Sequence, residues 1–154
     1  MLATSPARVF LGTAWSPDGK TIAFSTLDTM KGLRFVLWDV SVSNGSTREI
    51  YSAPGAIGRP RWLPDGSGLL VTISDRLQAF RSQLWFVSYP QGVARRLTND
   101  LLDYQACCLD LTRDGQTLVD TEQTRVSNLW IAPRGDASRA KQITTADIKV
   151  NSFS

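Results

Sequence analysis

The sequence contains no histidine, and only two of its 154 residues are cysteine. Without histidine the chain cannot by itself build a Ser-His-Asp or Cys-His nucleophile, nor a histidine-ligated metal site. It also lacks a glycine-rich phosphate loop of the P-loop or kinase type. We therefore expect this chain not to be an enzyme, to have no catalytic, cofactor-binding or metal-binding residues, and to need no cofactor.

Long apolar runs and concentrated charge are also missing. No segment approaches the roughly 18 apolar residues of a membrane span, and Met1 to Pro6 lacks the basic and apolar regions of a signal peptide. The 17 Lys and Arg against 14 Asp and Glu give a net charge of +3. The densest basic cluster is only Arg95-Arg96, so we expect neither membrane insertion nor nucleic-acid binding. These features do not assign a cellular compartment.

The two cysteines, Cys107 and Cys108, are neighbours. Adjacent side chains on a strand point to opposite faces, so we expect no disulfide between them. The favoured interpretation is two small, buried apolar residues. A redox pair or a metal site is the alternative, but neither a CxxC motif nor a histidine supports it.

Three sequence markers recur in the same order with one period. Asp-Gly pairs are 47 and 49 residues apart, and Leu-Trp pairs are 47 and 45 residues apart. An apolar residue within a polar stretch recurs after 47 and 46 residues. The markers are Asp18-Gly19, Asp65-Gly66 and Asp114-Gly115; Leu37-Trp38, Leu84-Trp85 and Leu129-Trp130; Ile50, Leu97 and Ile143. Together they indicate three copies of one unit.

Each unit reads as four short strands. In the first unit, Pro17 and Asp18-Gly19 predict a tight turn between strands, because proline presets φ and glycine accepts positive φ. The second and third strands are apolar at consecutive positions, so they must be covered on both faces. Four-stranded antiparallel sheets of this kind, at a period in the forties, are typical of β-propeller blades. No window shows a helical period, so helix should be nearly absent.

The predicted fold class is all-β: a β-propeller of about three four-stranded antiparallel blades, either a partial propeller or a fragment of one with about six to eight blades. We expect a single domain with approximate blades at 7–53, 57–100 and 104–146. Residues 148–154 should be the first strand of a further blade, because Phe153-Ser154 takes the place of Trp15-Ser16.

The segment from Trp15 to Lys20, WSPDGK, is followed by the short apolar strand Ile22 to Phe24. With the Leu-Trp pairs, it resembles the repeat of TolB-type, WD-like bacterial propellers. The third unit departs from the pattern, reading TRDG at 112–115. Segments 94–100 and 127–133 are similar to C-terminal propellers of bacterial Ser/Thr protein kinases and winged-helix regulators. The resemblance implies a fold but not a function, since propellers serve as docking platforms and enzyme scaffolds alike.

Two sets of carboxylates need an interpretation. We expect the Asp-Gly aspartates Asp18, Asp65 and Asp114 to be turn formers in successive blades rather than a catalytic set. A second set of three acidic residues could instead gather near the propeller axis and bind a cation, which is the alternative interpretation. Calcium sites draw several oxygens from one compact loop, which these scattered residues do not form. The second set is Asp110, Asp120 and Glu122.

The tryptophans at repeat spacing are expected to pack between blades rather than to stack on a ligand. They are Trp38, Trp85 and Trp130. Trp15 and Trp62 should lie nearer the axis and are better ligand candidates. The favoured recognition surface is a set of rim loops that includes 27–33 and 76–81.

Three functions remain open. The favoured one is a noncatalytic protein-interaction or sensor module of a larger bacterial protein, with a protein partner. The second is the accessory propeller of an enzyme whose Ser/Thr kinase or serine peptidase domain lies outside this chain. The third is a self-associating structural element, because three blades cannot close a ring. Each open blade face would measure about 380 Å², comparable to the largest apolar patch on a typical monomer.

Overall fold

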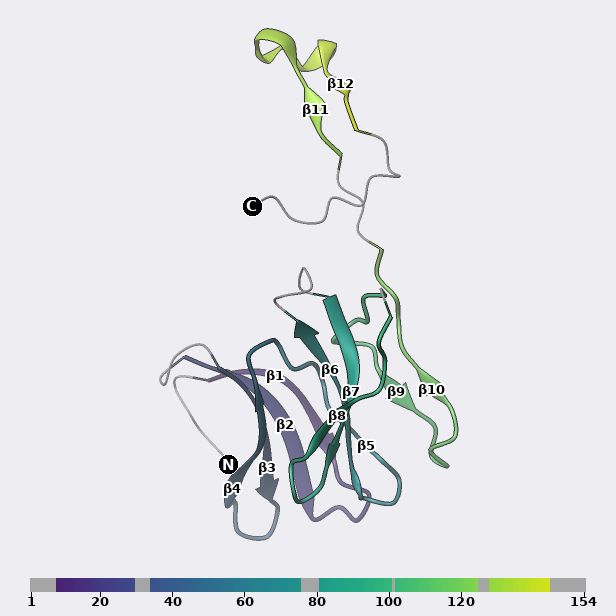
Figure 1. The fold of residues 1–154 in the computed structure, drawn as a ribbon. Coiled ribbons are helices and arrows are strands. Elements are labelled where there is room, and N and C mark those ends of the chain that lie inside the picture. The colour runs from purple at the N-terminus through teal and green to yellow at the C-terminus, as the bar shows by residue number, and fades with distance from the viewer. Residues whose placement is uncertain (1–7, 30–33, 76–80, 101, 125–127, 145–154) are drawn as a thin grey trace. The chain divides into compact units, whose positions relative to one another are not determined.

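The computed structural model describes residues 8–29, 34–75, 81–100, 102–124 and 128–144. In this part of the chain the fold is all-β, as expected (Figure 1). Among the residues that the structure describes, helix is limited to two 3-10 turns, η2 (Pro133–Gly135) and η3 (Ala137–Arg139). None of the described helices is long or apolar enough to cross a membrane. The chain divides into two compact units, residues 1–123 and 124–154.

The first blade is a four-stranded antiparallel sheet in the order β1-β2-β3-β4. Four consecutive residues of β2, from Ala23 to Thr26, are buried, which confirms that this strand is covered on both faces. Gly19, with a φ of 69°, closes the turn between the first two strands. The strands are β1 (Arg8–Trp15), β2 (Thr21–Asp28), β3 (Arg34–Ser41) and β4 (Thr47–Ala53).

The second blade repeats this sheet in the order β5-β6-β7-β8. Residues 69–73 of its second strand are all buried. Trp62 pairs with Leu69 as Trp15 pairs with Ile22, so the sequence repeat is also a repeat of strand register. The strands are β5 (Arg61–Trp62), β6 (Gly68–Asp75), β7 (Arg81–Ser88) and β8 (Ala94–Arg96).

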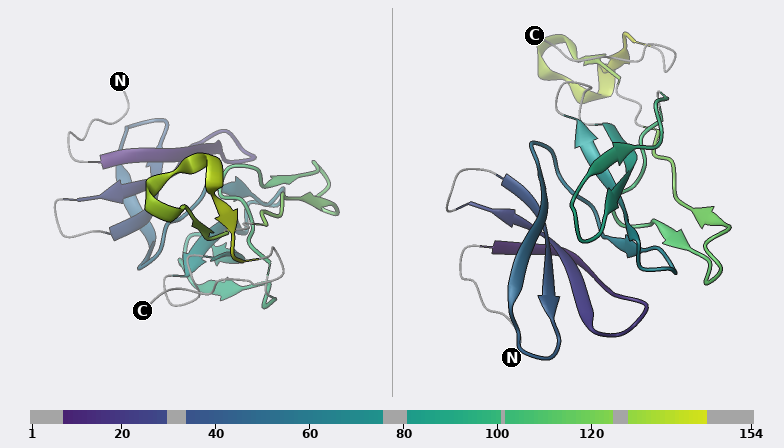
Figure 2. Two further views of the ribbon diagram at one scale, coloured as in Figure 1. Left: turned by 90° about the horizontal axis from the view of Figure 1, so that it is seen from above. Right: turned by 60° about the horizontal axis from the view of Figure 1, so that its bottom comes forward.

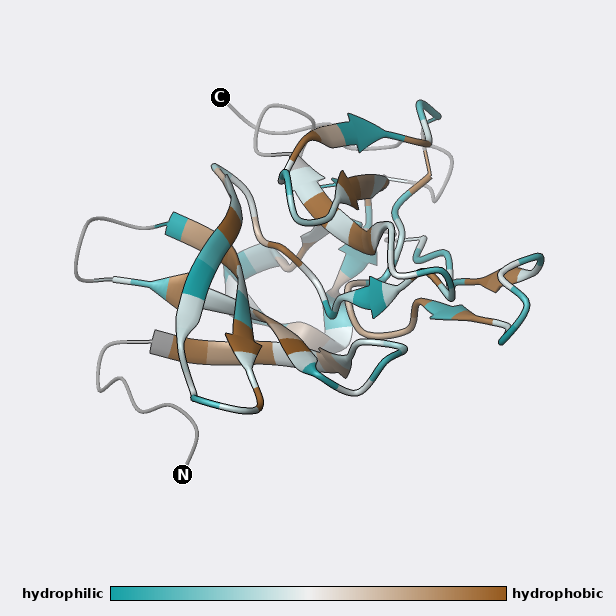
Figure 3. Cartoon of the chain, turned by 90° about the horizontal axis from the view of Figure 1, so that it is seen from below, coloured by the Kyte–Doolittle hydropathy of each residue, from teal (hydrophilic) through white to brown (hydrophobic). Residues whose placement is uncertain are grey.

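The first two blades pack against each other around a shared apolar core (Figures 1 and 2). The blades approach closely at Gly12, where an added Cβ would lie 2.8 Å from the Cα of Arg59. Apolar residues, brown in Figure 3, run along the strands, while the turns that join them are largely hydrophilic. The buried residues of the shared core are Ala23, Leu37, Ile50, Ala53, Ile57, Trp62, Leu69, Val71, Ile73 and Val87.

The third predicted blade differs from the expected single four-stranded sheet. Its described strands form two separate two-stranded sheets, β9 (Asp110–Leu111) with β10 (Leu118–Val119), and β11 (Trp130–Ile131) with β12 (Lys141–Gln142). The first pair belongs to unit 1 and the second to unit 2.

Sequence explains this difference. The second strand of the third unit offers two apolar residues, Leu118 and Val119, before the polar stretch from Asp120 to Gln123, whereas 69–73 offers an almost unbroken apolar run. Val119 is accordingly 60% exposed. The β9–β10 pair is held to the second blade by fully buried Leu109, which packs with Leu70 and Leu84. The further strand expected at 148–154 lies outside the described residues.

Candidate interaction surface on the first blade

The register of the two complete blades shows which of their residues are equivalent. Phe10 pairs with Thr26, and Ile57 forms the matching bridge with Ile73, 47 residues further along. Trp15 and Trp62 are related by the same offset, at the opposite end of the first strand of each blade. Each pair of equivalent residues therefore reports on the same position in two successive blades.

In the second blade these positions are buried against the first blade. Ile57 is fully buried and Trp62 is only 9% exposed. The indole Nε1 of Trp62 donates a hydrogen bond to the carbonyl oxygen of Ala14 at 3.2 Å. Its ring meets Tyr89 edge-on, with centroids 4.7 Å apart. Trp62 is therefore a blade–blade contact residue, and the expectation that it would be a ligand candidate is wrong.

In the first blade the equivalent residues are exposed. Phe10 is 50% exposed and Trp15 is 59% exposed. Phe10 and Trp15 lie on the same face of the sheet, because they pair with Thr26 and Ile22, and we call these two residues the β1 patch. The same positions that seal the second blade onto the first thus remain uncovered in the first blade.

Charged and aromatic groups complete the contact between the two blades. Arg48 of the first blade forms an ion pair with buried Asp39, at 2.5 Å, and its Cζ lies 5.3 Å from the ring centroid of Tyr89 in the second blade. The hydrogen bonds that Arg48 donates to the Asp39 carboxylate raise the pKa of Arg48, and burial raises the pKa of the Tyr89 hydroxyl. A guanidinium over an aromatic face adds a cation–π attraction to the apolar packing.

The Asp-Gly aspartates are turn formers, as expected. Each accepts hydrogen bonds within its own turn, and these hold its pKa below the usual value. The glycine that follows each has a φ near 70°. The principal donors are the Ser16 hydroxyl to Asp18, the Ser67 backbone N–H to Asp65 and the Thr112 hydroxyl to Asp114.

The carboxylates considered as a cation site are engaged separately. Asp110 pairs with the Arg61 Nε at 3.2 Å. Asp120 accepts a hydrogen bond from the Thr121 backbone N–H at 2.8 Å, and burial raises its pKa. The main chain of Glu122 forms a β-bridge with Tyr104. Among the described residues, no three metal-ligating side chains come together.

The tryptophans at repeat spacing have different environments. Trp85 is half-buried and packs against the shared core, while Trp38 is half-buried and donates to the Thr26 hydroxyl at 3.1 Å. Trp130 lies on the two-residue strand β11 of unit 2, so its expected packing between blades stays a prediction. Most of the rim-loop residues, 30–33 and 76–80, lie outside the described part of the chain.

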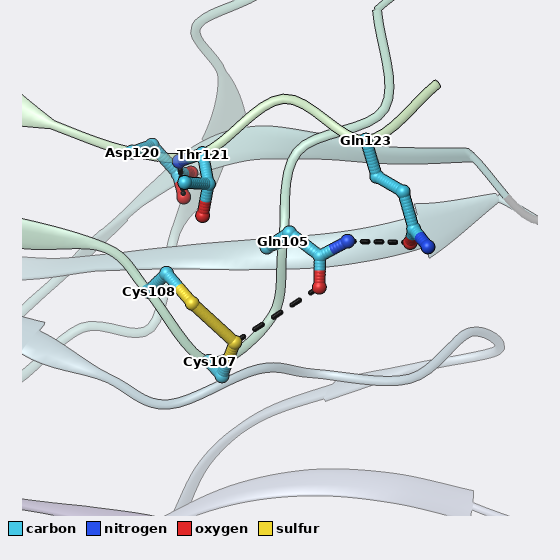
Figure 4. The surroundings of a disulfide bond; sticks show 6 residues. All are labelled: Gln105, Cys107, Cys108, Asp120, Thr121 and Gln123. Atoms are coloured by element: carbon cyan, nitrogen blue, oxygen red, sulfur yellow. Dashed lines mark hydrogen bonds between the residues drawn. A yellow bond between two sulfur atoms is a disulfide. The ribbon is translucent and has the colours of Figure 1, made fainter. Parts of the chain in front are cut away.

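Cys107 and Cys108 form a disulfide with each other (Figure 4). Both residues are exposed. The expectations of no disulfide and of burial are therefore wrong. The pair lies at a turn centred on 106–107 and not on a strand, so the two side chains need not point to opposite faces.

No protein-family model matches the sequence, and a search of curated proteins found no match. Among solved structures, the chain is similar to a putative TolB from Agrobacterium tumefaciens, with a TM-score of 0.62, 17% identity, and coverage of 84% of this chain and 44% of that one. It is also similar to TolB from Acinetobacter baumannii, with a TM-score of 0.61, 20% identity and coverage of 82% and 30%.

A chain from a structural study of two prolyl endopeptidases has a TM-score of 0.60 and 16% identity, with coverage of 94% of this chain and 22% of that one. This chain thus spans less than half the length of each of these three proteins. At such identities the likeness concerns the fold alone. Taken with the two complete blades, it shows that the chain has a TolB-like fold, that of a partial β-propeller.

Proposed function

We propose that this chain is a noncatalytic propeller module of a larger bacterial protein and acts by binding a protein partner. The observation that carries the proposal is the β1 patch. Trp15 is 59% exposed, while Trp62, its equivalent, is buried in a blade–blade contact. Exposed aromatic residues in an apolar group are a common mark of protein interfaces.

The Trp62 contact indicates what the partner at the β1 patch should offer. Trp62 finds a backbone carbonyl for its indole N–H and an apolar sheet to lie against. We infer that a partner would offer Trp15 the same two contacts, and a propeller blade of the same kind supplies both. When the chain is studied by itself, that blade comes from a second copy.

The test is the solution mass of the isolated chain, measured by light scattering over a range of concentrations. We expect a dimer or larger assembly for the natural sequence and mainly monomer for Trp15→Arg, which places a charge in the contact. Val93→Arg is the matched control, because Val93 is 66% exposed and lies outside the patch, between β7 and β8. A monodisperse natural chain that stays monomeric at high concentration would refute the proposed contact.

An accessory role beside an enzyme domain is the second candidate. The similarity to a chain from a study of prolyl endopeptidases favours it over other enzyme-linked roles. The full-length reading frame distinguishes the two candidates: a kinase or α/β-hydrolase segment beside the blades supports the accessory role. In both cases, purified chain should hydrolyse no peptide, ester or nucleotide, since it has no histidine and no phosphate loop.

A further inference from the structure

The first strand of the third unit contains two residues more than its equivalent in the second unit. Two pairings fix the comparison in each unit. In both units, the two paired residues on the second strand are three positions apart. On the first strand, their two partners are four positions apart in the second unit but six positions apart in the third. The pairings are Ile57–Ile73 and Arg61–Leu70 in the second unit, and Tyr104–Glu122 and Asp110–Val119 in the third.

This insertion produces the turn that carries Cys107 and Cys108. The base of the turn is anchored on both sides. The Ala106 carbonyl accepts a hydrogen bond from the Arg59 backbone N–H at 2.9 Å, and Leu109, directly after the pair, is 1% exposed. The two cysteines themselves are exposed. A disulfide is thus presented to solvent from a fixed position.

The turn lies where the first strands of successive units adjoin. Gly12 of the first unit contacts Arg59 of the second, and Arg59 bonds to Ala106 of the third. In a propeller, blades are arranged radially around a central channel, and in this chain the first strands of successive units adjoin one another. Insertions at such places on a repeated scaffold are where recognition and chemistry concentrate.

Adjacent cysteines form an unusual disulfide. The Cα atoms of Cys107 and Cys108 are 3.8 Å apart, whereas most disulfides span about 4.4–6.8 Å. Disulfides outside the usual geometry, and exposed ones, are the easily reduced ones. We propose that Cys107–Cys108 is a reversible thiol–disulfide exchange site that reacts with thiols of low molecular weight.

The exchange balances as follows. The thiolate of an incoming thiol attacks one cysteine sulfur, the S–S bond breaks, a mixed disulfide forms, and the electron pair stays on the other cysteine as thiolate. A second thiolate attacks the incoming sulfur of the mixed disulfide and releases the first cysteine. Both cysteine thiolates take up protons from water. Two small thiols are oxidised to one disulfide, and the cysteine pair gains two electrons.

Gln105 supports the reduced form. Its Oε1 lies 3.9 Å from the Cys107 sulfur, and its Nε2 donates a hydrogen bond to Gln123 (Figure 4). A disulfide sulfur carries no hydrogen, so only the reduced Cys107 thiol can donate to that amide oxygen. The amide is held in place by Gln123 and by its own backbone, whose N–H bonds to the Thr121 carbonyl at 2.9 Å. The reduced pair thus has a hydrogen-bond partner already in position.

The experiment places the whole chain in glutathione buffers of graded composition, traps free thiols with an alkylating reagent and reads the intact mass. We expect conversion between zero and two free thiols per chain while the far-ultraviolet circular dichroism stays native. Cys107→Ser and Cys108→Ser should each stop at one bound glutathione, and the double variant should bind none. Gln105→Ala should shift the balance about twofold toward the disulfide, as loss of one weak hydrogen bond predicts.

Phenylarsine oxide provides an independent readout, because a trivalent arsenical binds two neighbouring thiols together. We expect one equivalent per reduced natural chain, removable by a dithiol but not by a monothiol, and loss of this binding in either single variant. The proposal is overturned if the disulfide opens only as the native dichroism is lost, which would make it purely structural. It is equally overturned if oxidised glutathione leaves two stable mixed disulfides without closing the pair.

Discussion

Replacement of Trp62 by alanine tests the blade–blade contact most directly. The indole is 9% exposed and belongs to a core to which both blades contribute. The change removes the ring from that core, the hydrogen bond to the Ala14 carbonyl and the edge contact with Tyr89. All three losses fall at the junction between the blades, so the change weakens their association and leaves the strands within each blade intact.

The expected loss can be set from these contacts. Truncation of a buried tryptophan or phenylalanine to alanine typically costs about 3–5 kcal/mol, which includes the cavity left behind. Within that sum the hydrogen bond accounts for about 1 kcal/mol and the aromatic edge contact for roughly 0.5–1.5 kcal/mol. Trp62→Phe keeps most of the ring but removes the N–H donor, so it should cost about 1–2 kcal/mol. Trp15→Ala, at an exposed position, should cost less than about 1 kcal/mol.

Urea unfolding followed by far-ultraviolet circular dichroism is the assay, because tryptophan fluorescence would change with the substitutions themselves. The urea midpoint should be highest for Trp15→Ala, lower for Trp62→Phe and lowest for Trp62→Ala. The dependence of the unfolding free energy on urea concentration should change little. If Trp62→Ala lowered the free energy of unfolding no more than Trp15→Ala does, the Trp62 side chain would contribute no more to stability than the exposed Trp15 side chain. The interpretation of Trp62 as the residue that joins the blades would then be wrong.

Two further predictions concern the strand approach and the turns. Gly12→Val should lower the urea midpoint by an amount equivalent to about 1–3 kcal/mol, because its side chain would meet Arg59. Gly19→Ala should cost only about 1 kcal/mol for its positive φ, because nothing lies within 4 Å of the added Cβ. Equal urea midpoints for the two variants would contradict the close approach at Gly12. Turn hydrogen bonds lower the pKa of Asp65 in the folded state, so its contribution to stability is present above the unfolded value of 3.8 and is lost as the pH falls through the folded value. Asp65→Asn should therefore flatten the fall in urea midpoint below about pH 4, and an unchanged pH profile would contradict this role.

The sequence was sufficient to predict the first two blades because each signal there has a local physical cause. Asp18-Gly19 and Asp65-Gly66 form the turns that their residue types require, with positive φ at both glycines. Consecutive apolar residues in β2 and β6 are buried as a strand covered on both faces should be. The similarity of the chain to TolB structures agrees with the fold predicted from the repeat.

The third unit could be predicted less well, because its markers persist while its core residues do not. Asp114-Gly115 still forms its turn, but Leu118 and Val119 are exposed on a two-residue strand. A turn motif specifies three or four residues, whereas a sheet needs apolar partners along several strands. Spacing alone therefore predicted a complete blade where the described residues form two separate short sheets.

The cysteine pair was misinterpreted because a strand was assumed where the chain turns. The signal was present in the spacing of the Asp-Gly pairs, which is 47 residues between the first two units and 49 between the second and third. Those two additional residues are the insertion that produces the turn with Cys107 and Cys108. The role of Trp62 was missed for a different reason, because exposure depends on which neighbour covers a position. The equivalent Trp15 precedes a similar Pro-Asp-Gly turn but has no such cover.

The hydrogen bond from Trp62 to Ala14 has a direction. The donor, Trp62, lies on the second blade and the acceptor, Ala14, on the first, so the two surfaces that meet here are different. Such a contact is heterologous, and copies joined by it follow one another head to tail. If the rotation from one copy to the next returns to its start, the result is a closed ring; otherwise it is an open filament that grows with concentration. The angle between successive blades, and not the strength of their contact, thus determines whether an assembly of these chains is finite.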